Sequence, residues 1–314
     1  MADDRTAVDT PSRALHYVRE AFPDLDAHEA RALDEGWASY PYMIDDTWVF
    51  RFPRGDRIPA DQVERQYRKE RQFLPRLAPR VAVAVPEIEC VAELSDGRTF
   101  MGHRAIHGVP LTRDGIDAMS PSACDAIVVQ FAGFLRALHD FPIDEAREVG
   151  VHDSRGRDEY AEFGEETRHS VFPALSAHER AGCATLFEMF LGDDGNFECE
   201  AVVTHGDLGG RHVLLDETPR VVGIIDYGSV GIGDATYDFF PAVFDLGEEF
   251  TRRVLAEYGH RDPDRAVGAA YFYRVADVLD GWLEGIREGA EWKIEDKRRE
   301  LGRALEAYAE RGNA

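Results

Sequence analysis

The stretch VVTHGDLGGRHVLLD (residues 202–216) and the RVVGIIDYG that follows it (residues 220–228) decide the fold of this chain. Together they contain two short aliphatic runs, Val213–Leu215 and Val221–Ile225, and the second is rich in β-branched residues. The turn sequence ETP lies between the runs, and short apolar runs on either side of a turn predict a β-hairpin. We therefore expect a buried hairpin with polar residues at its ends.

Three of these polar side chains have an informative spacing. Asp207 and His212 are five residues apart before the hairpin, and Asp226 comes fourteen residues after His212. A carboxylate beside a buried hairpin costs desolvation free energy unless a cation or hydrogen-bond donors compensate it. In phosphoryl transfer from a nucleotide, one Asp accepts the proton of the substrate hydroxyl, and a residue five positions later and a second Asp hold magnesium. The spacing therefore predicts a phosphoryl-transfer site.

Two other interpretations of these residues stay open. One is a polar loop whose Asp side chains cap turns. The other is a transition-metal hydrolase site, because the residue types of His205, Asp207, His212 and Asp226 allow it. The position of the second Asp and the GIGDATYD segment at 231–238 favour phosphoryl transfer over both.

The chain resembles the antibiotic phosphotransferases, that is, the aminoglycoside and macrolide kinases, at four segments: HGDL (205–208), HVLLD (212–216), GIIDYG (223–228) and GDATYD (233–238). One position departs from the aminoglycoside kinases, which usually have Asn where this chain has His212, whereas macrolide kinases commonly have His there. Imidazole can bind a divalent ion, but magnesium prefers oxygen ligands. The resemblance implies an α+β, protein-kinase-like fold of two lobes. An N-terminal nucleotide-binding lobe with an antiparallel sheet would span 1–107, and a mostly helical catalytic and substrate-binding lobe would span 108–314.

The resemblance also implies roles for the residues around the hairpin. Asp207 would orient and deprotonate the substrate hydroxyl. Asp226 would hold Mg²⁺ with help from His212, and ATP or GTP would be the phosphoryl donor. His205 would brace the catalytic loop, and Asp238 would hold this loop through hydrogen bonds.

In the first lobe, residues 36–53 predict a strand, an Asp-Asp turn and a second strand. In the resembling family this place holds the loop that covers the nucleotide, here with Gly36 and Ser39. A phosphate-binding Lys or Arg follows on the second strand, and Arg51 stands at that position. Arg is always charged and offers a fork of donors to phosphate.

The helix predicted over 61–74 places Glu70 on its apolar side, together with Tyr67 and Leu74. A carboxylate on an apolar face is costly without a partner. We therefore expect an Arg51–Glu70 pair, matching the cation–Glu pair of kinases. The same helix carries competing cations: Arg65, Arg68, Lys69 and Arg71.

Residues 99–108 correspond in the family to the last strand of the small lobe and the hinge. Backbone groups of Arg104 and Ile106 would pair with the purine edge there, and His103 would guard the pocket behind the base.

Helices are predicted near both ends of the chain. A short one is expected at 27–33, and longer ones at 239–258, 264–288 and 292–311. Family members use the C-terminal helices as an acidic wall for the substrate, which here would involve Asp245, Asp280, Trp282 and Glu284. A solvated helix face is the alternative for each carboxylate, and core packing is the alternative for Trp282.

The composition narrows the classes of partner. The net charge of −24 disfavours nucleic acid, because neutralising phosphates needs a basic face. The same charge would attract a polycationic small molecule, although solubility alone also explains it. The sequence contains no apolar run of the roughly 18 residues that a membrane span needs. Four scattered cysteines favour reduced thiols in a cytoplasm over disulfides or a zinc site.

We therefore predict a kinase that transfers the γ-phosphoryl group of ATP or GTP to a hydroxyl of an aminoglycoside-type antibiotic, as a resistance enzyme. The open alternatives are a macrolide phosphotransferase, a kinase of a metabolite such as a sugar, choline or homoserine, and a pseudokinase that only binds ligands.

Overall fold

The computed structural model describes residues 8–33, 38–55 and 59–312, and its fold is the predicted mixture of an antiparallel sheet and many helices. The chain forms two compact units. The first contains residues 1–110, 145–150 and 213–228, and the second contains 111–144, 151–212 and 229–314.

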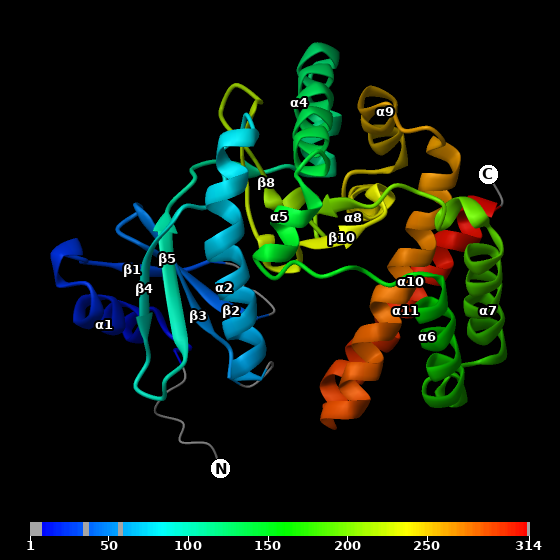
Figure 1. The fold of residues 1–314 in the computed structure, drawn as a ribbon, viewed down its shortest axis with the longest axis horizontal. Helices are drawn as coiled ribbons and strands as arrows, with labels where there is room; N and C mark the ends of the chain where they lie inside the picture. The colour runs from blue at the N-terminus through cyan, green and yellow to red at the C-terminus, as the bar shows by residue number, and fades with distance from the viewer. Residues whose placement is uncertain (1–7, 34–37, 56–58, 313–314) are drawn as a thin grey trace. The chain divides into compact units, whose positions relative to one another are not determined.

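The first unit is built on a five-stranded antiparallel sheet in the order β1-β2-β3-β5-β4 (Figure 1). Its strands are β1 (Ala30–Ala32), β2 (Ser39–Ile44), β3 (Trp48–Pro53), β4 (Ile88–Glu93) and β5 (Thr99–Arg104). The predicted Asp-Asp turn joins β2 to β3, and both of its residues have positive φ, 49° at Asp45 and 50° at Asp46. Two left-handed residues give the backbone twist that a tight hairpin needs. The predicted Gly36 loop lies outside the described residues.

The helix predicted over 27–33 is wrong, because Ala30–Ala32 form strand β1. The N–H groups of His28 and Glu29 bond the carboxylate of Asp45 at 2.7–3.0 Å, which takes donors that a helix would use. The next residues then pair with the edge of β2. Tertiary hydrogen bonds outweigh the local periodicity here.

One helix covers each face of this sheet. Helix α1 (Pro11–Ala21) packs Ala14 and Val18 against an aromatic cluster that includes Phe50 and Phe100. Helix α2 (Ala60–Leu77) packs Val63 and Tyr67 against Met101 on the other face. Successive residues of a strand point to opposite faces, so Phe100 and Met101 belong to different cores. This alternation directs Arg51 and Met101 toward α2.

The predicted hairpin is confirmed. Strands β8 (Val213–Leu215) and β9 (Val221–Ile224) pair antiparallel, with Val213 opposite Ile224, and β6 (Val109–Pro110) extends the sheet on the β8 side. Gly223 is needed in this hairpin, since a Cβ there would lie 2.4 Å from a methyl carbon of Ile106.

The second unit is mostly helical, with a two-stranded sheet of β7 (Val202–Thr204) and β10 (Gly231–Gly233). The long helices α10 and α11 lie side by side (Figure 1). The helices are α3 (Arg113–Ala118), α4 (Pro121–His139), α6 (Arg157–Ser170), α7 (Ala177–Gly192), α8 (Phe240–Asp245), α9 (Glu248–Tyr258), α10 (Pro263–Glu288) and α11 (Glu291–Gly312), while α5 (Ile143–Glu148) spans the border of the two units.

The single helix predicted over 239–258 is divided into α8 and α9. Gly247, with φ of 98°, separates the two helices, and a right-handed helix cannot continue through that conformation. None of the described helices is long and apolar enough to cross a membrane.

Candidate active site

In the first unit the predicted pair of Arg51 and Glu70 is formed. Arg51 lies on β3 and Glu70 on α2, and their side chains share a short hydrogen-bonded ion pair. Glu70 is 1% exposed, whereas the Arg51 side chain is 14% exposed. Burial raises the pKa of Glu70, and the neighbouring guanidinium opposes that rise. Arg51 therefore anchors Glu70 in the interior and keeps part of its fork accessible.

Three of the four competing cations of α2 have other partners. Arg65 pairs with Asp61 at 2.5 Å, and Arg68 lies 3.5 Å from Glu64. The ammonium group of Lys69 donates to the backbone carbonyl of Gly228 at 2.9 Å. The choice of Arg51 follows from burial, because Glu70 is the buried carboxylate of α2.

Asp226 belongs to the same unit and lies beside this pair. Its negative charge raises the pKa of both Arg51 and Glu70. Asp226 has a φ of 68°, which is uncommon for a non-glycine residue and costs free energy of order 1–3 kcal/mol. Such strained backbone concentrates at functional sites when the surrounding structure enforces it.

The residues after Asp226 are packed against α2 and enforce this conformation. Tyr227 is fully buried, with its ring 6.4 Å from that of Phe73. A Cβ on Gly228 would lie 1.9 Å from Nε2 of Gln66 on α2, so a larger residue there would displace this side chain. Helix α2 thus holds both Glu70 and the Asp226 segment.

The other predicted nucleotide-binding residues also lie in the first unit. Ser39 is 8% exposed, and its side chain hydrogen-bonds Tyr67. The guanidinium of Arg104 stacks 4.0 Å from the ring centroid of Trp48. The backbone carbonyl oxygen of Arg104 is 2.8 Å from Nδ1 of His103. Because a carbonyl oxygen only accepts hydrogen bonds, His103 must donate. Ile106 packs beside Gly223 of the hairpin.

His103 makes the stability of the protein pH-dependent. Burial lowers its pKa from the ordinary 6.5 to about 4. The unfolded chain takes up a proton below pH 6.5 and the folded chain resists it until about pH 4, so this contribution is complete above pH 6.5 and is lost as the pH falls toward 4. The loss amounts to about 3 kcal/mol of the free energy of unfolding.

We expect that urea unfolding at pH 7 and pH 4.5 will show a smaller difference for His103→Gln than for the unchanged protein. His169→Gln, at an exposed position, serves as the control and should keep the full difference. An unchanged pH dependence in His103→Gln would contradict this assignment.

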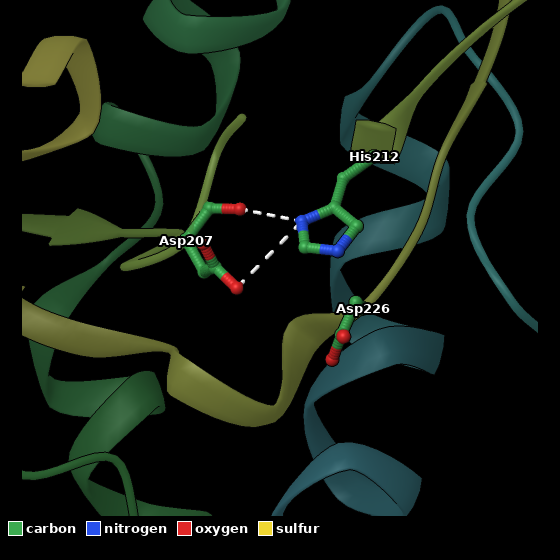
Figure 2. A group of neighbouring side chains, drawn as sticks. All are labelled: Asp207, His212 and Asp226. Carbon is green, nitrogen blue, oxygen red and sulfur yellow. Dashed lines mark hydrogen bonds and ion pairs between the residues drawn. The ribbon is translucent and has the colours of Figure 1, made fainter. Parts of the chain in front are cut away.

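In the second unit Asp207 and His212 are close together. Nδ1 of His212 is 2.6 Å from the backbone oxygen of Asp207 and 3.8 Å from its carboxylate. Figure 2 draws these side chains together with Asp226 and shows one ring nitrogen of His212 turned toward the backbone oxygen and one carboxylate oxygen of Asp207. His212 is 6% exposed, whereas Asp207 is half-buried.

Arg211 is a contact residue that the sequence interpretation missed. It donates from Nη2 to the Asp207 carboxylate at 2.7 Å and from Nε to Nε2 of His212 at 3.0 Å. The helical turn Gly210–His212 brings positions 207 and 211 together at i, i+4 spacing. That spacing is visible in the sequence, and it was the only available signal.

The loop that carries Asp207 is held from behind by Asp238. One oxygen of this fully buried carboxylate accepts the N–H of Gly206 at 2.8 Å, and the other accepts the N–H of His205 at 2.7 Å. Nε2 of His139 donates to it as well, at 3.1 Å. The imidazole of His205 accepts the N–H of Asp207 at 3.3 Å. The predicted hydrogen bonds from Asp238 to the loop are therefore present.

We expect Asp238→Asn to lower the free energy of unfolding by about 1–3 kcal/mol. The amide would present its NH₂ to a donor, which leaves at least one of the three buried donors without an acceptor. Urea denaturation measures the change. Asp117→Asn removes the same charge at an exposed position of α3 and should be near neutral. Equal stabilities for the two variants would contradict this role.

The four predicted substrate contacts have different surroundings. Asp245, at the end of α8, is exposed and accepts the N–H of Gly210 at 3.1 Å, beside the Asp207 loop. Asp280 pairs with Arg155 at 2.9 Å. Glu284 bonds the buried Lys293 at 2.9 Å, and Trp282 is only 2% exposed. Trp282 is thus part of the core, and Glu284 belongs to a helix–helix ion pair.

One further group, the phenol of Tyr237, interacts electrostatically with Asp207. Burial raises the pKa of Tyr237 well above its ordinary value, and the charges of Asp277 and Asp207 raise it further. Tyr237 lies in the GDATYD segment, but no sequence pattern shows that Asp277 of α10 lies near it.

A buried cation–glutamate pair beside an aspartate, and a separate His-Gly-Asp loop, are features of kinase-like phosphotransferases. Residues 29–271 match the phosphotransferase enzyme family. Viomycin phosphotransferase from Streptomyces vinaceus is 31% identical over 214 residues, which cover 67% of this chain and 72% of that protein. The chain belongs to the phosphotransferase enzyme family.

Two solved structures are similar over nearly the whole chain. The GDP complex of aminoglycoside 2'-phosphotransferase-IIIa has a TM-score of 0.86 at 29% identity and covers 94% of this chain and 99% of that one. The GDP and kanamycin complex of APH(2")-IIIa has a TM-score of 0.83 at 29% identity and covers 92% and 98%. The predicted kinase-like fold is therefore confirmed, and the protein is a phosphotransferase of the antibiotic-kinase type.

Proposed function

We propose that this phosphotransferase moves the γ-phosphoryl group of a purine nucleoside triphosphate to a hydroxyl group of an aminoglycoside. The observation that carries the proposal is the cluster of Arg51, Glu70 and Asp226 in the first unit. The similarity to a structure that holds GDP and kanamycin supports both the donor and the acceptor.

The nucleotide would bind to the first unit. Arg51, oriented by Glu70, offers the exposed part of its guanidinium to the phosphates. Backbone groups of Arg104 and Ile106 would pair with the purine edge. Ser39 was predicted to belong to the covering loop, but it is the first residue of strand β2 and would follow that loop. His103, whose Nδ1 donates to the carbonyl of Arg104, would guard the pocket behind the base.

Magnesium would be held by Asp226 and His212. His212 directly precedes Val213 in the chain. Val213 pairs with Ile224, and Asp226 comes two residues after Ile224. The exposed carboxylate of Asp226 suits a hard cation, and the imidazole is a weaker ligand for it. Bound magnesium would neutralise charge on the transferring phosphate.

Asp207 would accept the proton of the attacking hydroxyl. Its loop is supported by Asp238 and His205, which hold the backbone of the loop before substrate arrives. Positioning of this kind is the main contribution that a protein makes to phosphoryl transfer.

The acceptor would be an aminoglycoside, a small molecule with several cationic amino groups. The net charge of −24 attracts such cations, and Asp245, Asp277 and Asp280 supply carboxylates on α8 and α10. Trp282 and Glu284 have roles in packing and are left out of this wall. Viomycin is a second candidate acceptor, favoured by the 31% identity to viomycin phosphotransferase.

The test is to incubate the protein with magnesium, ATP or GTP, and a panel of aminoglycosides, viomycin and macrolides, and to measure the mass of each product. We expect an added phosphoryl group on at least one aminoglycoside. Modification of viomycin alone, or of a macrolide alone, would overturn the aminoglycoside assignment. Modification of none would refute an antibiotic acceptor and favour a metabolite kinase or a binding protein.

A further inference from the structure

Asp207, Arg211 and His212 form a closed ring of three hydrogen bonds within the second unit. His212 meets the Asp207 carbonyl at 2.6 Å, Arg211 Nε meets His212 Nε2 at 3.0 Å, and Arg211 Nη2 meets the Asp207 carboxylate at 2.7 Å. The Arg211 side chain is nevertheless 63% exposed. The guanidinium of Arg211 can therefore leave the ring without any unfolding of the surrounding residues.

The ring also determines the tautomer of His212. A carbonyl oxygen only accepts hydrogen bonds, so Nδ1 of His212 carries the proton. In a neutral imidazole the other nitrogen, Nε2, then holds the single lone pair of the ring. A guanidinium only donates hydrogen bonds, so the Nε–H group of Arg211 donates to this lone pair on Nε2.

A metal ion needs the same lone pair. Histidine ligates a divalent cation through an unprotonated ring nitrogen, while the other nitrogen donates to a carbonyl or carboxylate. The bond from His212 to the Asp207 carbonyl already supplies this second contact. The hydrogen bond from Arg211 and a His212–metal bond therefore exclude each other.

We propose that Arg211 is a positioning residue that holds Asp207 and His212 in place before metal binds and that a divalent cation must displace it from His212. This inference rests on the proposed ligation of metal by His212. Arg211 also places a positive charge next to the cation site, so its removal strengthens metal binding by two routes.

The experiment measures Mn²⁺ affinity by electron paramagnetic resonance of free Mn²⁺, with a non-hydrolysable ATP analogue bound to the full chain. We expect Arg211→Gln to lower the dissociation constant for Mn²⁺ by about five-fold, as loss of one competing hydrogen bond implies. Arg220→Gln is the matched control, because Arg220 is also an exposed partner of an i,i+4 Asp, at 67% exposure. It should leave the affinity unchanged.

His212→Ala tests metal ligation by His212 separately from the competition between Arg211 and the metal. If His212→Ala weakens Mn²⁺ binding while Arg211→Gln leaves it unchanged or weaker, Arg211 does not compete with the metal, although the ligand assignment stands. If His212→Ala leaves Mn²⁺ binding unchanged, the ligation by His212 is refuted, and the role of Arg211 falls with it. Thermal unfolding of each variant verifies that it is folded.

Discussion

Asp207→Asn is expected to lower kcat by about 10²- to 10⁴-fold, the contribution of a general base. The amide keeps the size of the carboxylate but cannot accept the proton of the hydroxyl. Because the nucleotide would bind to Arg51 and its neighbours in the first unit, nucleotide affinity should stay unchanged. Turnover is measured with the antibiotic that the panel identifies, and nucleotide binding by calorimetry.

Asp216→Asn is the control for this variant, since Asp216 is an Asp of the hairpin turn whose carboxylate bonds Thr218 and Arg220. It should retain activity. If Asp207→Asn also keeps near-normal turnover, Asp207 is not the base, and the proposed mechanism is wrong even if the protein is a kinase.

Glu70→Leu is expected to lower the free energy of unfolding by about 3–5 kcal/mol, because it leaves a buried guanidinium without its partner. Glu70 is 1% exposed, so water cannot replace the lost carboxylate. Urea denaturation measures this cost. Arg51→Met combined with Glu70→Leu should recover most of it, since two apolar side chains of similar volume need no charge compensation.

The double variant also separates stability from function. If Arg51 binds the phosphates, the double variant should be stable and still have weakened nucleotide binding. Arg68→Met, which removes the exposed cation of a surface pair on the same helix, should change stability little. A double variant with unchanged nucleotide affinity would show that the buried pair is only structural.

Several features of the fold were predictable because they depend on local pattern. The hairpin of β8 and β9 follows from two aliphatic runs around a turn, and α2 follows from its apolar spacing. The Arg51–Glu70 pair was also predictable, because a carboxylate on the apolar side of a helix requires a cation. The strand at Ala30–Ala32 was not, since the donors that hold it extended meet Asp45, 16 and 17 residues away in sequence.

The sequence by itself determined the class of the protein. The spacing of Asp207, His212 and Asp226 around a short hairpin is a local property, so it can be recognised without knowledge of the residues that pack around it. Only the tertiary structure decided which charges remain available at the site. Trp282 and Glu284 share one helix with Asp280, yet two of the three serve the packing of that helix. Helical periodicity gives a direction for each side chain but not the neighbour that lies there, and it is the neighbour that neutralises or buries a group.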